Sequence, residues 1–239
     1  MDSYQNQYLS GVQMYYATAV NTKKNEIIVE GDESKHILSV MRHSVGDQIF
    51  LTNGLGSIFS SRISEVSNKE ITASVEKEYK YTNKNKNIYF CLPQLKNPDR
   101  FEFALEKCIE FGITEFIVYK AKNSLAKSFK KERWEKIALA AMKQSLRAFL
   151  PKIDFIDDLG EIKFESGTMI LLDQSAKNSF SADRILPDEK YFVVLGPEGG
   201  FHKDEISLFN REHFFSLTEN RLRSETAIIL AAGLISLKK

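Results

Sequence analysis

Charges of both signs lie at positions 221–225, where an apolar stretch begins that is predicted to form a helix over 224–237. Arg221, Arg223 and Glu225 are crowded into five residues, and charges near the start of a buried helix are costly unless they are paired or used in chemistry. An arginine there could stabilise developing negative charge, and a glutamate could accept a proton or bind a hydroxyl group. The structural alternative is a surface ion pair, with Ser224 capping the helix.

A second candidate is the turn Gly-Pro-Glu-Gly-Gly at 196–200, which follows a strand predicted over 191–196. Glycine lets a backbone approach a ligand closely and adopt conformations that other residues avoid. The turn matches neither GxxxxGK[ST] nor GxGxxG, and Glu198 would repel a phosphate. A carboxylate among glycines suits hydroxyl groups, amines or a cation, a demand that an adenosine bearing a sulfonium would satisfy. The structural alternative is a tight turn into a helix that His202, Asp204 and Glu205 open.

Strands and helices alternate from position 88 onward, which predicts a mostly parallel sheet covered on both faces. Ligands bind beyond the carboxyl ends of the strands in such sheets. Three segments follow strands late in the chain and are expected to meet at that edge, namely 172–176, 196–201 and 217–227. The strands are expected at 88–93, 113–120, 152–156, 168–175, 191–196 and 213–217, and the helices over 97–112, 131–150 and 224–237.

Residues 14–80 have short alternating runs that predict a small barrel-like β domain, and the polar segment 81–87 is the expected linker to an α/β domain over 88–239. One short helix is expected over 32–43. We expect Asp32 or Ser34 to cap it, and its apolar face to comprise Ile37, Val40 and Met41.

The composition of the 239 residues is that of a globular protein, with 43% apolar residues and a net charge of +1. No run of 18 apolar residues is present, and the start of the chain has no secretory pattern, so a cytoplasmic protein without a membrane span is expected. The first 13 residues match no element and are expected to be disordered. Cys91 and Cys108 fit packing in a reducing compartment, and the four histidines have no metal-ligand spacing.

A basic segment interrupts this neutral average. Residues 120–152 contain ten lysines and arginines against two glutamates. Such a segment could form one face for a polyanion, although a solvated helix face would have the same composition.

Four stretches together resemble one family: LGPEGGF (195–201), LRSETA (222–227), QSLRAFLPKI (144–153) and HILSVMRHSVGD (36–47). The family is the bacterial ribosomal RNA small-subunit (16S) uridine N3-methyltransferases, within the SPOUT group of knotted enzymes that use S-adenosylmethionine. The resemblance implies a SPOUT-type knotted, mostly parallel α/β domain, an N-terminal PUA-like β-barrel that binds RNA, and a homodimer. It implies no metal. One departure is Thr218, where the family usually has glycine.

The resemblance also implies the site residues. Arg223 and Glu225 would be catalytic. The cofactor would contact Leu172, Leu195, Gly196, Pro197, Glu198, Gly199, Gly200, Leu217, Thr218, Leu222, Thr226 and Ala227. The 16S ribosomal RNA of the small subunit would contact His36, Arg42, Lys143 and Arg147.

The expected reaction is methyl transfer to N3 of a uridine that is splayed out of its base pair. Arg223 would face the negative charge on the uracil oxygens, and Glu225 would take the N3 proton or anchor the base. Two alternatives stay open from the sequence: a SPOUT methyltransferase that acts on another RNA base, such as one in transfer RNA, and a ribosome-assembly protein that binds RNA without catalysis. A nucleotide-dependent oxidoreductase is disfavoured because the glycine fingerprint is missing.

Overall fold

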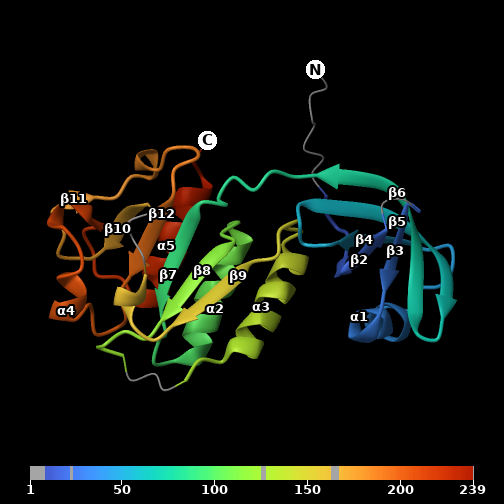
Figure 1. The fold of residues 1–239 in the computed structure, drawn as a ribbon, viewed down its shortest axis with the longest axis horizontal. Helices are drawn as coiled ribbons and strands as arrows, with labels where there is room; N and C mark the ends of the chain where they lie inside the picture. The colour runs from blue at the N-terminus through green and yellow to red at the C-terminus, as the bar shows by residue number, and fades with distance from the viewer. Residues whose placement is uncertain (1–8, 22–23, 125–127, 163–166, 239) are drawn as a thin grey trace. The chain divides into compact units, whose positions relative to one another are not determined.

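The computed structural model describes residues 9–21, 24–124, 128–162 and 167–238. The chain forms two compact units (Figure 1). Residues up to 84 and residues 142–150 make up the first unit, and residues 85–141 and 151–239 make up the second. The predicted disorder of the first 13 residues falls mostly on 1–8, which lie outside the described residues.

The first unit is built on a six-stranded sheet in the order β1-β4-β5-β6-β3-β2. β1 pairs with β4 in parallel, and the other pairs are antiparallel. Buried side chains such as Ile27, Ile49, Leu51 and Ile71 form its core. The strands are β1 (Met14–Tyr16), β2 (Ala19–Asn21), β3 (Glu26–Val29), β4 (Gln48–Thr52), β5 (Ser57–Ser67) and β6 (Glu70–Lys80).

The helix of the first unit differs from its prediction at both ends. α1 (Gly31–Lys35) has no side-chain cap, and the Ser34 hydroxyl donates instead to the carbonyl oxygen of Lys69. A π-helical turn, η1 (His36–Val40), follows and buries Ile37. Because a π-turn holds more residues than an α-turn, Val40 does not fall above Ile37. Val40 is 64% exposed and Met41 39%, so the predicted apolar face was wrong for both.

The second unit has a parallel sheet of seven strands in the order β11-β13-β10-β12-β7-β8-β9. β10 lies between β12 and β13, so the chain passes from one side of β10 to the other before α5 returns to pack on α2 and β12. The predicted fold class, a mostly parallel α/β sheet with a β-rich N-terminal region, is confirmed. The strands are β7 (Ile88–Pro93), β8 (Glu115–Tyr119), β9 (Lys152–Ile156), β10 (Thr168–Leu172), β11 (Asn178–Ser179), β12 (Tyr191–Leu195) and β13 (Phe214–Ser216).

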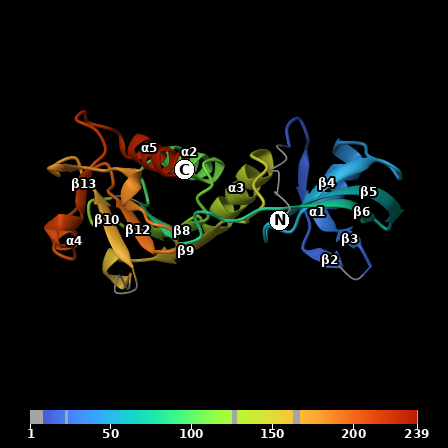
Figure 2. The same ribbon diagram turned by 90° about the horizontal axis from the view of Figure 1, so that it is seen from above.

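Helices cover this sheet, and α2 and α5 lie side by side along it (Figure 2). α2 (Pro98–Glu110) begins as predicted, because Asn97 Oδ1 accepts the backbone N–H groups of Asp99 at 2.9 Å and Arg100 at 3.4 Å. The other helices are α3 (Lys131–Gln144), α4 (Lys203–Ile206) and α5 (Ser224–Ser236), with short 3₁₀ turns η2 (Leu159–Glu161), η4 (Ala182–Arg184) and η5 (Arg211–His213).

The predicted helix over 131–150 is too long. α3 ends at Gln144, and Leu146 has the left-handed φ of 55°. The backbone after it bonds to a turn of the first unit, with Ala148 accepting from Gly56 at 2.8 Å and Leu150 donating to Gly54 at 2.8 Å. These bonds take the place of further helical bonds, so the helix ends well before Pro151.

Candidate active site

A cleft of about 1050 Å³ lies where β10, β12 and β13 end. Its walls come from the three strand-end segments expected from the sequence, joined by Arg100 from the first turn of α2. The predicted residues that line it are Leu172, Leu195, Gly196, Pro197, Glu198, Gly199, Gly200, Leu217, Thr218, Leu222, Arg223 and Ala227.

Two predicted residues do not line this cleft. Thr226 is exposed and lies outside the lining, and Glu225 is behind the wall. Several other residues line the cleft that the sequence placed in these segments without naming an individual role. Asp173, Gln174 and Ser175 directly follow β10 and belong to the predicted segment 172–176. Arg100 lies 72 or more residues earlier in the chain than the other lining residues, and nothing in its neighbourhood marks it. Phe201, Asn220 and Ser224 also lie in the predicted segments and line the cleft, as does Arg221, which the charge pattern had singled out.

Hydrogen bonds from neighbouring elements hold the end of β12 in place. The hydroxyl of Tyr119, at the end of β8, donates to the carbonyl oxygen of Leu195 at 2.7 Å. Tyr119 is fully buried, and burial raises the pKa of its phenol well above the ordinary value. The phenol therefore stays protonated and keeps its donor on the residue from which the glycine turn starts.

The glycine turn could not accept larger residues without moving. Gly200 has a φ of 71°, in the region that favours glycine. A Cβ on Gly199 would lie 2.9 Å from the carbonyl oxygen of Asn123, which is closer than Cβ atoms approach oxygen. Asn123 in turn donates through Nδ2 to the carbonyl oxygen of Gly200 at 3.2 Å. The turn is thus fitted against the segment that follows β8.

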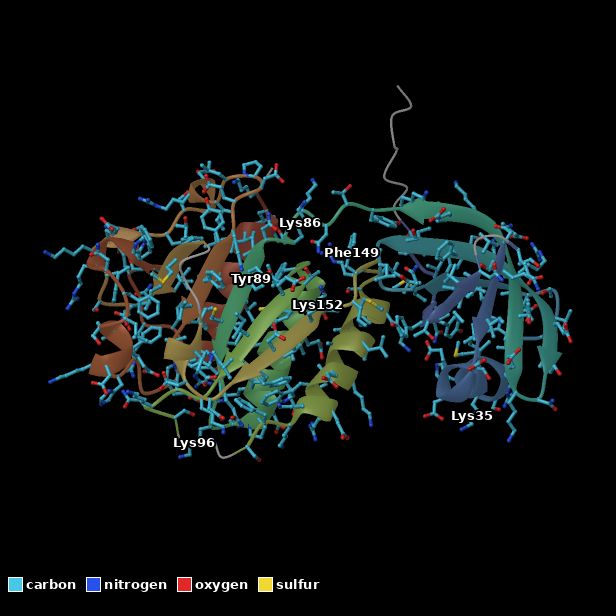
Figure 3. The ribbon with its side chains drawn as sticks, viewed as in Figure 1. Lys35, Lys86, Tyr89, Lys96, Phe149 and Lys152 are labelled. Carbon is cyan, nitrogen blue, oxygen red and sulfur yellow. The ribbon has the colours of Figure 1, made fainter. Side chains whose placement is uncertain are left out.

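Two carboxylates fix the same turn from either end. Glu198 Oε1 accepts the backbone N–H of Lys96 at 3.2 Å, and Lys96 follows the carboxyl end of β7 (Figure 3). Glu205 is 2% exposed and accepts the backbone N–H groups of His202 at 2.7 Å and Lys122 at 3.0 Å. Glu205 and His202 form the capping box of α4, so the predicted opening of that helix is confirmed. Among the described residues the other carboxylate oxygen of Glu198 accepts no hydrogen bond, which leaves it for a ligand.

The two predicted catalytic residues, Arg223 and Glu225 of segment 217–227, differ in their surroundings. Arg223 is exposed, lines the cleft and immediately precedes α5. Glu225 is 9% exposed, and its Oε1 lies 3.6 Å from Nε of Arg100. Its Oε2 is buried and has no hydrogen-bond partner among the described residues. Glu225 therefore pairs with α2 rather than with the arginines of its own segment.

This pair is an unusual feature of the cleft wall. A buried carboxylate oxygen without a donor is costly, and such groups are found at functional sites more often than elsewhere. The cation of Arg100 offsets the charge of Glu225. The cleft as a whole combines apolar side chains with carboxylates and arginines, which suits an organic ligand with a cationic and an apolar part.

The predicted RNA contacts all lie in the first unit, because Lys143 and Arg147 belong to segment 142–150. Arg42 is exposed, and His36 is half-buried against the edge of the Tyr15 ring, with 6.2 Å between ring centroids. Lys143 Nζ lies 2.8 and 2.9 Å from the two carboxylate oxygens of Glu33, so its charge is neutralised within the unit. Arg147 keeps an exposed surface, although desolvation lowers the pKa of its guanidinium.

The described ranges give no support for a metal site, a membrane span or a reactive cysteine. Those residues contain no group of three or more acidic, histidine or cysteine side chains that could hold a metal ion. Within the same ranges, no helix has the length and apolar character needed to cross a membrane. Cys91 and Cys108 are buried and unpaired with each other, and burial raises the pKa of both thiols, so they are unreactive packing residues.

Comparisons with known proteins agree with this geometry. A model of the RNA methyltransferase domain matches residues 82–236, and a model of the RNA methyltransferase PUA domain matches residues 29–76. Ribosomal RNA small subunit methyltransferase E of Mesomycoplasma hyopneumoniae (strain 232) is 30% identical over 90% of this chain and 96% of its own length.

Solved structures show the same fold. The crystal structure of a probable rRNA-methyltransferase from Porphyromonas gingivalis has a TM-score of 0.77 at 27% identity, over 92% of this chain and 95% of that chain. Ribosomal RNA small subunit methyltransferase E from Neisseria gonorrhoeae bound to S-adenosyl methionine has a TM-score of 0.77 over 92% of this chain and 95% of its own. At 22% identity that likeness shows the fold alone. The predicted SPOUT-type fold with an N-terminal PUA domain is confirmed, and the chain belongs to the RNA methyltransferase family.

Proposed function

We propose that this protein uses S-adenosylmethionine to methylate N3 of one uridine in the 16S ribosomal RNA of the small subunit. The observation that carries the proposal is that three strand-end segments form a single cleft, lined by Arg223 and backed by the buried Glu225. The names of the relatives support ribosomal RNA of the small subunit as the substrate. The choice of uridine N3 comes from the sequence resemblance and from the chemistry of these two side chains.

The residues of the cleft fit the cofactor. Leu172, Leu217 and Leu222 offer apolar surface for an adenine ring, and the cleft volume of about 1050 Å³ is ample for a molecule of this size. Carboxylates suit its ribose hydroxyls, its amine and its positive sulfonium, and the lining supplies Asp173 and Glu198. When bound, S-adenosylmethionine supplies an electrophilic methyl group. Thr226 is left out of this set because it lies outside the lining.

The chain's own part in the reaction is to position the base and manage its charge. Uracil N3 must lose its proton before it can attack a methyl group, and the resulting negative charge spreads onto O2 and O4. Arg223 is exposed on the cleft wall and carries no carboxylate partner among the described residues, so its guanidinium is available to that charge. Glu225 accepts the N3 proton, for which its carboxylate must turn from Arg100 toward the cleft.

We assign RNA binding to the first unit. Its match to a PUA domain of RNA methyltransferases supports this role, and Arg42, His36 and Arg147 are the proposed contacts. Lys143 is the weakest member of the predicted set, because its ammonium already serves Glu33. Since phosphate contacts release counterions, the affinity for RNA should fall steeply with salt.

We also propose a homodimer, formed in the cytoplasm where ribosomes assemble. The apolar residues of α5 are not confined to one stripe, and a helix that is apolar all round is normally buried. Ile229, Leu230 and Leu234 are only half-buried, and Leu237 is 79% exposed. A second copy packed on this helix would cover them. Light scattering of the purified protein should give about 55 kDa, twice the 27.3 kDa of one chain.

The proposal is tested by mapping modified nucleosides in ribosomal RNA from cells that lack the protein. One N3-methyluridine of 16S ribosomal RNA should be missing, and the purified chain with S-adenosylmethionine should restore it. Restoration of a different base, or of a transfer RNA position, would reject the substrate. Arg223→Ala should lower kcat by about 10²–10³ while cofactor affinity stays the same. An equal loss of both would reject the role of Arg223.

A further inference from the structure

Charge is distributed unevenly around the cleft. Its lining includes three arginines, Arg100, Arg221 and Arg223, and two acids, Asp173 and Glu198. Arg100 is offset by Glu225 at 3.6 Å. In the described part of the chain, no carboxylate forms an ion pair with Arg221 or Arg223. Arg221 and Arg223 therefore give the cleft a positive wall, and Glu219 of the same segment is not part of the lining.

The two acids belong to the other strand-end segments, and each is tied down there. Asp173 Oδ1 accepts the backbone N–H of Ser175 at 2.8 Å, and Glu198 Oε1 accepts the backbone N–H of Lys96 at 3.2 Å. These bonds hold the carboxylates at the ends of β10 and β12, and among the described residues neither acid forms an ion pair with an arginine. An anionic ligand group is therefore attracted to one wall, and a cationic group to the other.

Arg221 is exposed and lines the cleft, but it has no role in the reaction proposed above. It lies two positions before Arg223 in a segment that is neither helix nor strand, and both side chains line the cleft. Arg223 is extended, with φ −73° and ψ 154°. Just before them, the Thr218 hydroxyl donates to the carbonyl oxygen of Asn220 at 2.7 Å and tightens the turn.

We infer that Arg221 binds a backbone phosphate of the RNA next to the target nucleotide, while Arg223 faces the base. This inference rests on the proposed function, because it takes an RNA nucleotide to be the second ligand of the cleft. A planar guanidinium that is exposed on the wall of a cleft and has no carboxylate partner is well suited to donate to a phosphate. Besides the uracil, which Arg223 faces, the other anion expected in the cleft is the carboxylate of the cofactor, and the experiment separates this carboxylate from the phosphate.

The test compares Arg221→Ala and Arg221→Lys with Arg211→Ala as a matched control. Arg211 is an exposed arginine of the same unit outside the cleft lining, so its loss changes the net charge equally. Binding of a 16S ribosomal RNA transcript is measured without cofactor between about 50 and 200 mM salt. Arg221→Ala should weaken binding about tenfold at low salt and reduce the slope of log K against log[salt] by about 0.7–0.9. Arg221→Lys should keep most of the slope, and Arg211→Ala should change it by less.

Cofactor binding and turnover complete the test. KM for RNA should rise about tenfold in Arg221→Ala, and this change should be much larger than any change in kcat at saturating RNA or in the dissociation constant for S-adenosylmethionine. Salt slopes that match the Arg211→Ala control overturn the inference, and a loss confined to cofactor affinity assigns Arg221 to the cofactor's carboxylate instead. Because the slopes need no turnover, a lowered slope in a protein that methylates no uridine would support this contact and reject the proposed function.

Discussion

The ion pair between Arg100 and Glu225 gives the sharpest test of how the cleft wall is built. Its atoms are 3.6 Å apart, and the side chains are 42% and 12% exposed. Coulomb attraction at that distance is about 1 kcal/mol in bulk water and about 4–5 kcal/mol at an effective dielectric constant of about 20. With one partner half in solvent and the other buried, we expect a coupling of about 2 kcal/mol.

A double-mutant cycle measures this coupling. Arg100→Met, Glu225→Gln and the double variant are unfolded in urea, and the coupling is the departure from additivity in the free energy of unfolding. Arg100→Met alone should cost the most, about 2–3 kcal/mol, because it leaves a buried carboxylate without a cation. Once Glu225 is already glutamine, the same replacement of Arg100 should cost much less.

An exposed ion pair serves as the control. Lys35 and Asp32 of α1 are only 2.9 Å apart, but their side chains are 58% and 99% exposed. Their coupling should be about 0.5 kcal/mol or less despite the shorter distance, because solvent screens the charges. If Arg100 and Glu225 couple no more strongly than this surface pair, Arg100 does not hold Glu225, and the picture of a paired carboxylate behind the cleft is refuted.

Two further predictions concern the end of β12 and its turn. Gly199→Ala should lower affinity for S-adenosylmethionine at least tenfold and destabilise the protein by about 1–3 kcal/mol, because the new Cβ would lie 2.9 Å from the Asn123 carbonyl oxygen. Calorimetry measures the affinity, with Gly233→Ala as the control. A Cβ at Gly233 would lie no closer than 3.7 Å to the Phe111 ring, so this variant should bind normally. Unchanged binding in Gly199→Ala would show that the turn is not fitted to its ligand. Tyr119→Phe should cost about 1 kcal/mol at pH 7 by removing the hydrogen bond to Leu195. Because burial raises the pKa of Tyr119 in the folded state, its contribution is complete below about pH 10 and is lost as the pH rises further. Urea unfolding at pH 7 and at about pH 10.5 should therefore show a smaller alkaline loss in Tyr119→Phe than in the parent, and equal losses would contradict this assignment.

The strand-end segments could be predicted from the sequence because parallel strands place their carboxyl ends at one edge of the sheet. Apolar runs marked β10 and β12, and the residues that follow them line the cleft as expected. Arg100 could not be found in this way. It is a surface-type residue on a helix distant in the sequence, and only the packing of α2 against α5 brings it to Glu225.

Local patterns failed where contacts distant in the sequence decide the backbone. Pro151 suggested a helix that continues to position 150, but hydrogen bonds to the turn at Gly54 and Gly56 end the helix at Gln144. Regular α spacing placed Val40 beside Ile37, and a π-turn separated them. In neither case do the neighbouring residues in the sequence indicate the departure.

The cleft itself is tested most directly by binding S-adenosylmethionine to the purified protein and solving the structure of the complex. Calorimetry should show one cofactor per chain, and the bound molecule should contact all three segments, at 172–175, 195–201 and 217–227. Absence of binding, or a cofactor bound away from these segments, would contradict the account and leave an RNA-binding protein of the same fold.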